Sequence, residues 1–479
     1  ALAIDRDAKE VQVEKDGKKS ILPYDKLVLA TGRRPKRLEL PGAGLQGIFT
    51  VSSMEEAIAI RERAAGGKAE RALIIGAGAI GLEMAEALSD LWGIDTSVIE
   101  ITDRILPGIL SPHLASMVQR HMEENGVKFF LSEKVTRFEG ERAVEKVLTD
   151  KGEILADTVI MAVGVEPNAD LARAAGLEIS DSGAVVVNDR LQTSDPCIFA
   201  GGDCIEIPNL ITGKPGYFPL GSMANRQGRV IGTNLAGGNA RFDGAVGSFV
   251  VKLFEMSAAS AGLNLDAAGA EGFDALSALV VQFDRAHFYP GKDLMYLELV
   301  VEKGTGRILG IQGIGNKGDG MVGRINAVAA ILKFRPTTQD LSDMELAYSP
   351  PFSAAMDILN ALGNTAENIL EGKNRVIEVD EFAEWWAGRD QKETFFLDCR
   401  GRGNAEPYVK KFTEDWKSIP QDELRGRLEE VPRDKRIVLI CNTGVRSYEA
   451  QIILDRFGIK NSFNLQGGMA ALKKWGLDP

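Results

Sequence analysis

Histidine and cysteine are scarce in this 479-residue sequence, which contains three histidines and four cysteines. So few histidines argue against a Ser–His–Asp triad and against a histidine-rich metal site. His113 and His121 fall on the polar side of a predicted helix at residues 112–125, where we expect them to contact solvent. No two cysteines have the C-x-x-C spacing of a metal or redox site, and no metal is predicted. The cysteines are Cys197, Cys204, Cys399 and Cys441.

Long hydrophobic runs are also missing. No run approaches the ~18 apolar residues of a membrane-spanning helix, and the N-terminal residues lack a signal-peptide core. The 68 acidic residues outnumber the 56 basic ones, for a net charge of −12, which argues against a nucleic-acid partner. The scattered cysteines suit a reducing compartment, so we predict a cytoplasmic protein. The length predicts about three domains.

One stretch has the pattern of a dinucleotide-binding βαβ unit. A short apolar strand at residues 72–75 leads into G-x-G-x-x-G at Gly76, Gly78 and Gly81, and a second strand follows at residues 96–99. The glycines permit a tight turn, close approach of a pyrophosphate and close packing of the helix on the strand. The helix start then offers free N–H groups to the phosphates. The helix is expected to carry an apolar stripe of Ile80, Met84, Leu88 and Leu91.

The residue that ends this unit bears on the choice of nucleotide. Glu100 lies 19 residues after Gly81, near the usual position of the acid that binds a ribose 2′-hydroxyl. It would repel a 2′-phosphate, so we predict NADH in preference to NADPH. A second G-x-G-x-x-G at residues 42–47 lacks the flanking strand and helix and is interpreted as a loop. An apolar strand is expected at residues 154–163. The predicted NADH contacts are Gly76, Gly78, Ile80, Gly81, Glu83, Glu100, Val163 and Gly164.

Two other segments indicate a flavin-binding domain. A buried strand at residues 27–30 ends in the Thr31-Gly32 turn, and a strand at residues 198–200 is followed by Asp203. A carboxylate at that sheet edge can accept hydrogen bonds from ribityl hydroxyls of FAD, although a turn aspartate bonding its own backbone is the alternative. A helix at residues 219–238 would place its N-terminus near the flavin ring. The predicted FAD contacts are Ala30, Thr31, Gly32, Gly202, Asp203, Pro219, Leu220 and Ala224.

The C-terminal part carries a different chemistry. An α+β block ends near residue 362, residues 360–374 are interpreted as a polar linker, and a new domain begins at Arg375. There Cys441 lies between a strand and a helix N-terminus, in the sequence CNTGVR. Several backbone N–H dipoles, together with Arg446, are expected to stabilise a thiolate or a persulfide anion at this position. Cys399 ends a neighbouring strand and is interpreted as a core residue, with a redox partner role as the alternative.

Two resemblances follow from these motifs. Residues 1 to about 360 resemble the pyridine nucleotide-disulfide oxidoreductases through LATG, GAGAIGLE, IFAGGDC and PLGSMANRQGR, and residues 375–479 resemble a rhodanese through LDCR, CNTGVRS and LQGGM. The combination is similar to the coenzyme A-disulfide reductase/rhodanese fusions, also described as NADH-dependent persulfide reductases. This resemblance implies an FAD-dependent homodimer whose third domain forms the dimer interface. It also implies that this domain brings Tyr289 (in FYPG) and Tyr348 (in AYSPP) to the partner's active site, where they donate hydrogen bonds to a sulfur leaving group.

The sequence departs from the family pattern in three ways. The first FAD glycine motif and the reductase cysteine of an S-F-x-x-C motif would both lie ahead of Ala1, so we expect the sequence to be a fragment. The rhodanese part lacks the usual G-H-I-P-G-A segment after LDCR.

The sequence therefore predicts an α/β protein with two doubly wound dinucleotide-binding domains, an α+β dimerisation domain and a C-terminal rhodanese-like domain. Their predicted bounds are 1–65 with 181–244 (FAD), 66–180 (NAD), 245–362 (dimerisation) and 375–479 (rhodanese). The predicted function is NADH-dependent reduction of coenzyme A persulfide, coenzyme A disulfide or polysulfide, with Cys441 carrying sulfane sulfur and coenzyme A as a further candidate ligand. The alternatives are an NADH oxidase or peroxidase, and a reductase whose last domain is a non-catalytic docking module.

Overall fold

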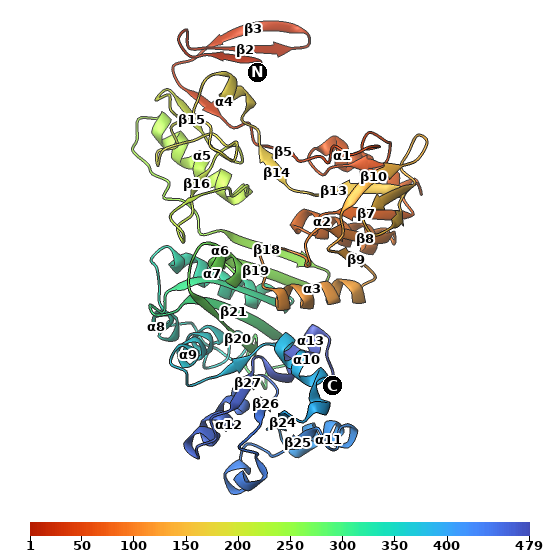
Figure 1. The fold of residues 1–479 in the computed structure, drawn as a ribbon. Helices are drawn as coiled ribbons and strands as arrows, with labels where there is room; N and C mark the ends of the chain where they lie inside the picture. The colour runs from red at the N-terminus through yellow and green to blue at the C-terminus, as the bar shows by residue number, and fades with distance from the viewer. The chain divides into compact units, whose positions relative to one another are not determined.

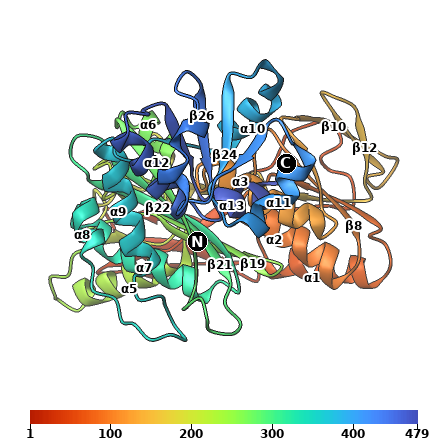
Figure 2. The same ribbon diagram turned by 90° about the horizontal axis from the view of Figure 1, so that it is seen from below.

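The computed structural model describes residues 1–479, which fold into two compact units. Unit 1 contains Ala1–Asp103 and Lys128–Gly247, and unit 2 contains Arg104–Val127 and Ser248–Pro479. Figures 1 and 2 show the elements of each unit from two directions. No helix combines the length and the apolar character needed to cross a membrane.

Unit 1 contains a five-stranded parallel sheet with the strand order β6-β13-β7-β8-β9. The strands are β6 (Ile48–Phe49), β13 (Thr158–Met161), β7 (Arg71–Ile75), β8 (Asp95–Glu100) and β9 (Lys128–Leu131). Helix α1 (Met54–Ala65) precedes β7, and α2 (Ala79–Glu86) follows it and continues into a π-helical turn, Ala87–Leu91. The predicted βαβ unit is therefore present, and its helix N-terminus lies at the carboxyl end of β7.

The apolar stripe predicted for this helix is only partly correct. Leu88 is buried, but Leu91 is 75% exposed. Leu82 and Ala85 are fully enclosed in its place. A π-helical turn inserts extra backbone into each turn, so the side-chain register that a 3.6-residue period predicts is lost after residue 86.

The strand predicted at residues 154–163 is two strands in two different sheets. Its first part, β12 (Glu153–Leu155), belongs to an antiparallel meander with β10 (Val135–Glu139) and β11 (Lys146–Thr149), whereas β13 joins the parallel sheet. The break falls at Asp157, whose carboxylate accepts hydrogen bonds from the backbone N–H groups of Glu70 and Arg71 at 3.0 and 2.9 Å. The apolar run at residues 154–163 therefore predicts one strand, although the chain passes from one sheet to another within it.

The rest of unit 1 surrounds a second core. Strand β4 (Leu27–Leu29) pairs in parallel with β15 (Ile198–Ala200), and β5 (Arg33–Pro35) pairs with β14 (Val165–Pro167). Strand β4 is buried on one side only, since Leu29 is 4% exposed and Val28 is 38% exposed. The remaining elements are β1 (Ala3–Asp5), β2 (Glu10–Lys15), β3 (Lys18–Pro23), α4 (Asp170–Ala174), β16 (Ile207–Pro208), β17 (Pro215–Gly216) and α5 (Gly221–Leu235).

Unit 2 is built on an antiparallel sheet with the order β18-β19-β22-β21-β20. Successive residues of a strand face opposite sides, and here Gln312 faces α3 (Pro112–Glu124) whereas Gly313 faces Met321 of α7 (Asp319–Leu332). The sequence did not predict β19, because its small residues, MSAASAG, lack a strand-like pattern. The strands are β18 (Ser248–Leu253), β19 (Met256–Gly262), β20 (Ala275–Phe283), β21 (Leu294–Glu302) and β22 (Ile308–Asn316), with α6 (Leu265–Ala270) between β19 and β20.

The predicted linker at residues 360–374 is wrong, because a helix occupies most of it. Helix α9 (Ile358–Leu370) follows α8 (Thr338–Ser342) and contacts β20 and β21. Its apolar residues Ile358, Leu359, Leu362 and Ala366 are all 0% exposed. The asparagines that gave this segment its polar appearance alternate with them, as on any amphipathic helix.

The C-terminal part of unit 2 is a parallel sheet with the order β23-β27-β26-β24-β25. Trp416 and Phe396 are fully buried in its core, and the ring of Trp386 meets both edge-on. The strands are β23 (Val376–Ile377), β24 (Thr394–Asp398), β25 (Trp416–Ser418), β26 (Arg436–Ile440) and β27 (Ser462–Leu465). The helices are α10 (Val379–Ala387), α11 (Arg402–Lys411), α12 (Val445–Arg456) and α13 (Gly468–Trp475), with 3₁₀ turns at Arg389–Gln391, Leu424–Gly426 and Leu428–Glu430.

Candidate functional site

A cavity of about 430 Å³ lies at the carboxyl edge of the parallel sheet in unit 1. It is lined by five of the predicted NADH contacts, which come from the ends of β7, β8 and β13. Ile80, Gly81 and Glu83 lie on α2 and do not line it. The five residues are Gly76, Gly78, Glu100, Val163 and Gly164.

The three glycines of the G-x-G-x-x-G motif have distinct steric roles. A Cβ on Gly76, which has φ +102°, would lie 2.5 Å from the carbonyl oxygen of Ala162. A Cβ on Gly81 would lie 2.0 Å from the carbonyl oxygen of Gly76, so only glycine allows the helix to pack this close. Gly78 is the N-cap of α2, has no neighbour within 4 Å of a Cβ position, and leaves the helix N-terminus without a side-chain cap. This arrangement fits a pyrophosphate, which such N–H groups bind.

Glu100 forms part of the cavity wall at the end of β8. Its carboxylate accepts hydrogen bonds from the N–H groups of Ala77 at 2.8 Å and Thr102 at 2.9 Å, and the residue is 8% exposed. The side chain is thus fixed beside the glycine loop by two backbone donors. A fixed anion in this wall can accept bonds from a ribose diol and disfavours a phosphate.

The residues predicted to contact FAD come together at the carboxyl ends of β4 and β15. Gly201 N–H donates to Leu29 O at 3.1 Å, which places the Ala30–Gly32 turn beside Gly202 and Asp203. Gly202 in turn lies against Ala224 of α5, with 3.7 Å between its Cβ position and that of Ala224. Helix α5 begins at Gly221 after Leu220, again without a side-chain cap. The first N–H groups of this helix therefore remain available to a hydrogen-bond acceptor, such as an atom of a flavin ring.

Asp203 is held by two neighbours. Its carboxylate forms an ion pair with Arg33 at 3.3 Å, and its backbone carbonyl accepts a hydrogen bond from Tyr217 Oη at 2.9 Å. Burial, reinforced by the Asp203 carboxylate, raises the pKa of Tyr217 to about 12, so the phenol stays a neutral donor. The turn is thereby fixed independently of the aspartate side chain, which remains 22% exposed.

The second site of chemical interest is the loop between β26 and α12 in unit 2. Cys441 is 2% exposed, and its Sγ accepts hydrogen bonds from Gly444 N–H at 3.1 Å and Ser447 Oγ at 3.2 Å. We expected several backbone donors, whereas the structure provides one N–H and one hydroxyl. Gly444 has φ +97°, a conformation that L side chains rarely adopt. This residue turns the chain back over the sulfur.

Helix α13 supports the loop from behind. The N–H groups of Met469 and Ala470 donate to the carbonyls of Cys441 and Asn442 at 2.8 and 2.9 Å. A Cβ on Gly468 would lie only 2.4 Å from Cys441 O, so the LQGGM glycine is what permits this approach. The Cys441 loop is therefore clamped between two helix N-termini.

A cavity of about 610 Å³ opens beside Cys441. Arg400, Arg446 and Lys473 line it, no carboxylate does, and Phe283 and Leu294 supply an apolar wall. Arg400 is held by Asp398, with 2.7 Å between Nη2 and Oδ2. Such a cavity suits a small anion or an anionic thiol derivative.

Arg400 and Lys473 were not predicted from the sequence, although it contains signals for both. Strands β24 and β26 pair with Asp398 opposite Ile440, so Arg400 emerges at the same edge as Cys441. Lys473 is one helical turn after Met469 and shares its face. Cys399 is 1% exposed and burial raises the pKa of its thiol, which supports its interpretation as a core residue.

Tyr289 and Tyr348 lie on two loops of unit 2 that touch each other. The first loop joins β20 to β21, and the second joins α8 to α9. Ala286 N–H donates to Pro350 O at 3.1 Å, which links the loops directly. Tyr348 is 50% exposed, and Tyr289 is half-buried. Both tyrosines thus lie on adjoining loops, where Phe288 and Phe352 are also exposed.

The prediction that His113 and His121 contact solvent is wrong. The His113 side chain is 10% exposed and its Nε2 lies 2.7 Å from Glu298 Oε2, while the His121 side chain is 12% exposed. Burial alone would lower the pKa of His113, but the adjacent Glu298 carboxylate raises it to about 9. Both histidines lie on α3, whose apparently polar side faces the sheet of unit 2 rather than water.

A second acid with an altered pKa lies in the same region and is partly buried. Burial raises the pKa of Glu378, the residue that precedes α10, to about 7, with Glu298 adding to the effect and His113 opposing it. Glu378 Oε1 accepts hydrogen bonds from Gln466 Nε2 at 2.6 Å and from Ser277 Oγ at 3.4 Å. These contacts attach the C-terminal parallel sheet to β20.

Comparison with known proteins now assigns the family. The model of the pyridine nucleotide-disulphide oxidoreductases matches residues 1–228, the model of their dimerisation domain matches residues 248–359, and that of the rhodanese-like domain matches residues 366–474. The NAD(P)H sulfur oxidoreductase (CoA-dependent) of Pyrococcus abyssi is 38% identical over 349 residues, which cover 73% of this chain and 77% of that protein. The chain belongs to the pyridine nucleotide-disulphide oxidoreductases.

Two further relatives of this oxidoreductase bear on its function. A NAD-dependent persulfide reductase from A. fulgidus has a solved structure with a TM-score of 0.92 and 39% identity, covering 98% of this chain and 84% of that one. An NADH oxidase from Methanocaldococcus jannaschii is 36% identical over 360 residues, covering 74% of this chain and 79% of that protein. The family and the fold class predicted from the sequence motifs are confirmed, including the rhodanese-like domain.

Proposed function

We propose that the protein is an FAD-dependent reductase that uses NADH to reduce coenzyme A persulfide, coenzyme A disulfide or polysulfide. The observation that carries the proposal is the Cys441 loop, in which Gly444 N–H and Ser447 Oγ both bond the sulfur beside a cationic cavity. This loop shares one chain with a glycine-lined nucleotide cavity. An oxidase has no use for such a loop, whereas a reductase of sulfane sulfur does.

Each cofactor has a group of residues that would hold it. The pyrophosphate of NADH would bind at Gly76 and Gly78, with its adenine ribose at Glu100 and its nicotinamide end near Val163 and Gly164. FAD would lie along the Ala30–Gly32 turn, Asp203 and the start of α5, and when bound would pass the two electrons of a hydride to a sulfur–sulfur bond. The Glu100 carboxylate is enclosed, and its hydrogen bonds come from backbone N–H groups rather than from a cation. It therefore keeps its negative charge toward the ribose, and we propose NADH as the preferred donor.

The substrate side involves the two tyrosines and Cys441. We propose that Tyr289 and Tyr348 donate hydrogen bonds to the departing sulfur, and that Cys441 carries sulfane sulfur with Arg446 as a cavity cation. A homodimer formed through residues 245–362 is supported by the match to a dimerisation domain. A cytoplasmic location is supported by the four free cysteines.

The overall reaction breaks one sulfur–sulfur bond. NADH gives a hydride and solvent gives a proton. Coenzyme A persulfide is thereby reduced to coenzyme A thiol and hydrogen sulfide, and NAD⁺ is formed. The test is steady-state NADH oxidation by the full-length protein with coenzyme A persulfide or polysulfide, with hydrogen sulfide measured in parallel. Turnover that does not exceed the oxygen-dependent background would overturn the proposal.

The similarity to an NADH oxidase supports a second candidate, oxygen reduction on the same cofactor frame. Stoichiometric formation of water or peroxide, unaffected by added persulfide, would favour it. For the last domain, a docking role without chemistry is the alternative. Detection of a persulfide on Cys441 by mass spectrometry after treatment with a sulfane-sulfur donor would count against that alternative.

A further inference from the structure

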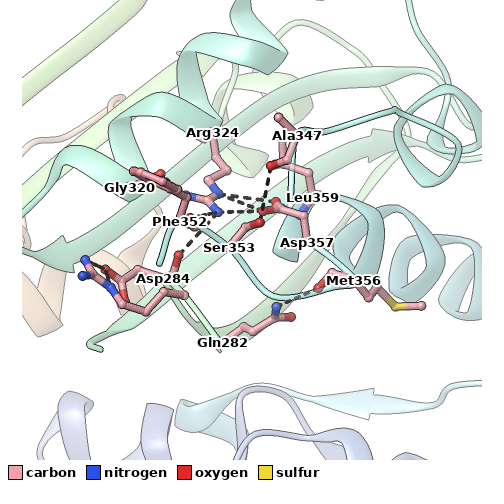
Figure 3. A network of polar contacts seen from close by, with 11 residues as sticks. Gln282, Asp284, Gly320, Arg324, Ala347, Phe352, Ser353, Met356, Asp357 and Leu359 are labelled. Carbon is pink, nitrogen blue, oxygen red and sulfur yellow. Dashed lines mark hydrogen bonds and ion pairs between the residues drawn. The ribbon is translucent and has the colours of Figure 1, made fainter. Parts of the chain in front are cut away.

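One arginine connects the two loops that carry Tyr289 and Tyr348. Arg324 extends from α7, and its guanidinium donates to Phe352 O at 3.2 Å and to Asp284 O at 3.5 Å. Asp284 begins the Tyr289 loop, and Phe352 lies four residues after Tyr348. Figure 3 shows the guanidinium pointing between these two segments. The loops therefore share a single donor group.

Arg324 itself is fixed from two sides. Its Nη1 donates to Gly320 O of the same helix at 2.9 Å, and its Nη2 lies 2.6 Å from Asp357 Oδ2. The side chains of Arg324 and Asp357 are only 13% and 6% exposed. Asp357 also caps α9 by accepting the N–H of Leu359 at 3.0 Å. An enclosed ion pair of this kind holds one geometry, because either charge alone would be costly to bury.

Backbone hydrogen bonds also close the neck of the first loop and a turn in the second. Asp284 and Asp293 exchange backbone and side-chain hydrogen bonds at the neck of the first loop, at 2.8 and 2.9 Å. In the second loop, the N–H groups of Phe352 and Ser353 both bond Ser349 O. Arg324 therefore binds the neck of the first loop at Asp284 and the turn that directly follows Tyr348 in the second loop.

We propose that Arg324 is a positioning residue that holds the two tyrosine loops at a fixed separation, so that both phenols reach the same departing sulfur. This inference rests on the proposed role of the tyrosines in the reductase reaction. The geometry of the guanidinium is essential to it. Nε and Nη2 together hold the Asp357 carboxylate, Nη1 donates to Gly320 O, and Nη2 also reaches the two loop carbonyls, whereas the ammonium of a lysine is a single point that cannot occupy all three nitrogen positions.

The test compares Arg324→Lys with Arg375→Lys. Arg375 forms an equally short ion pair, 2.6 Å to Asp455, but lies in the C-terminal domain away from the tyrosine loops. Arg324→Lys should lower kcat for coenzyme A persulfide roughly 10- to 100-fold, the loss expected from an ångström-scale misplacement of a reacting group. KM and the rate of flavin reduction by NADH should change little. Arg375→Lys should leave all three parameters near wild type.

Two further measurements separate positioning from a loss of stability. Amide hydrogen exchange in Arg324→Lys should rise in residues 284–293 and 345–357 together and stay unchanged elsewhere. In a Tyr289→Phe/Tyr348→Phe background, Arg324→Lys should have almost no additional effect on kcat. Independent, additive losses, or unchanged exchange in both loops, would overturn the inference. A tyrosine double variant with wild-type turnover would instead refute the proposed role of the tyrosines, and the exchange result would still test the clamp.

Discussion

Ser447 Oγ lies 3.2 Å from Cys441 Sγ, and the serine side chain is completely enclosed. A hydrogen bond to a charged acceptor contributes about 1.5–3 kcal/mol, so Ser447→Ala should slow sulfur transfer through Cys441 roughly 10- to 100-fold. Reduction of the flavin by NADH should not change. The matched control is Ser418→Ala, which removes a buried hydroxyl of the same domain that has no partner. A sulfurtransferase assay on both variants tests this prediction. Equal rates for Ser447→Ala and Ser418→Ala would mean that Ser447 does not stabilise the sulfur anion.

The approach of α13 to the Cys441 loop predicts a strong effect at Gly468. A Cβ there would lie 2.4 Å from Cys441 O, and the residue has φ +56°, so Gly468→Ala must displace the loop. We expect at least a tenfold loss of sulfur transfer, roughly 1.4 kcal/mol in the barrier, and a lower melting temperature. Gly403→Ala is the control, since its Cβ would meet nothing and α11 should gain about 0.5–1 kcal/mol. A fully active Gly468→Ala variant would contradict the clamp.

Nucleotide preference should depend on the charge of Glu100. Glu100→Gln keeps an acceptor for Ala77 N–H but removes the anion from the cavity wall. We expect NADH efficiency to fall and NADPH efficiency to rise, narrowing the ratio of the two kcat/KM values roughly tenfold, about 1.4 kcal/mol. Glu62→Gln on the exposed side of α1 should leave this ratio unchanged. A wild-type protein that already prefers NADPH would show that Glu100 has been assigned wrongly.

Two ionisable groups of unit 2, Glu378 and His113, should stabilise the fold less as the pH rises from about 4.5 to about 9. Glu378 has a folded pKa of about 7 against 4.5, so the folded state keeps its proton while the unfolded chain loses it, and stability drops between those values. His113 has a folded pKa of about 9 against 6.5, so its stabilisation is complete below 6.5 and is lost as the pH approaches 9. Urea unfolding at several pH values should show this decline. His113→Gln should flatten the upper part and Glu378→Gln the lower part, whereas His287→Gln, at an exposed site, should alter neither.

Local motifs were the predictable part of this protein. The strand–glycine–helix context around Gly76 and the loop after β26 are set by neighbouring residues, so the sequence predicts both. Contacts between distant segments were not predictable. His113 pairs with Glu298, 185 residues further along the chain, and nothing in the helix pattern around His113 reveals the acid. Arg324 was overlooked for the same reason, because its partners lie in two loops that only the folded sheet brings together.

The helix found where a linker was predicted changes how the Cys441 domain can work. After α9 the chain is fastened at once, since Asn374 N–H bonds Asn368 O at 2.9 Å and Arg375 N–H bonds Gln451 Oε1 at 2.9 Å. A flexible tether would give Cys441 an effective concentration, typically in the mM range, at every site within its radius. The packed helix α9 instead holds Cys441 at one position within unit 2. If Cys441 carries sulfane sulfur as proposed, the sulfur therefore starts from one fixed place in unit 2, and movement of a free tether cannot deliver it.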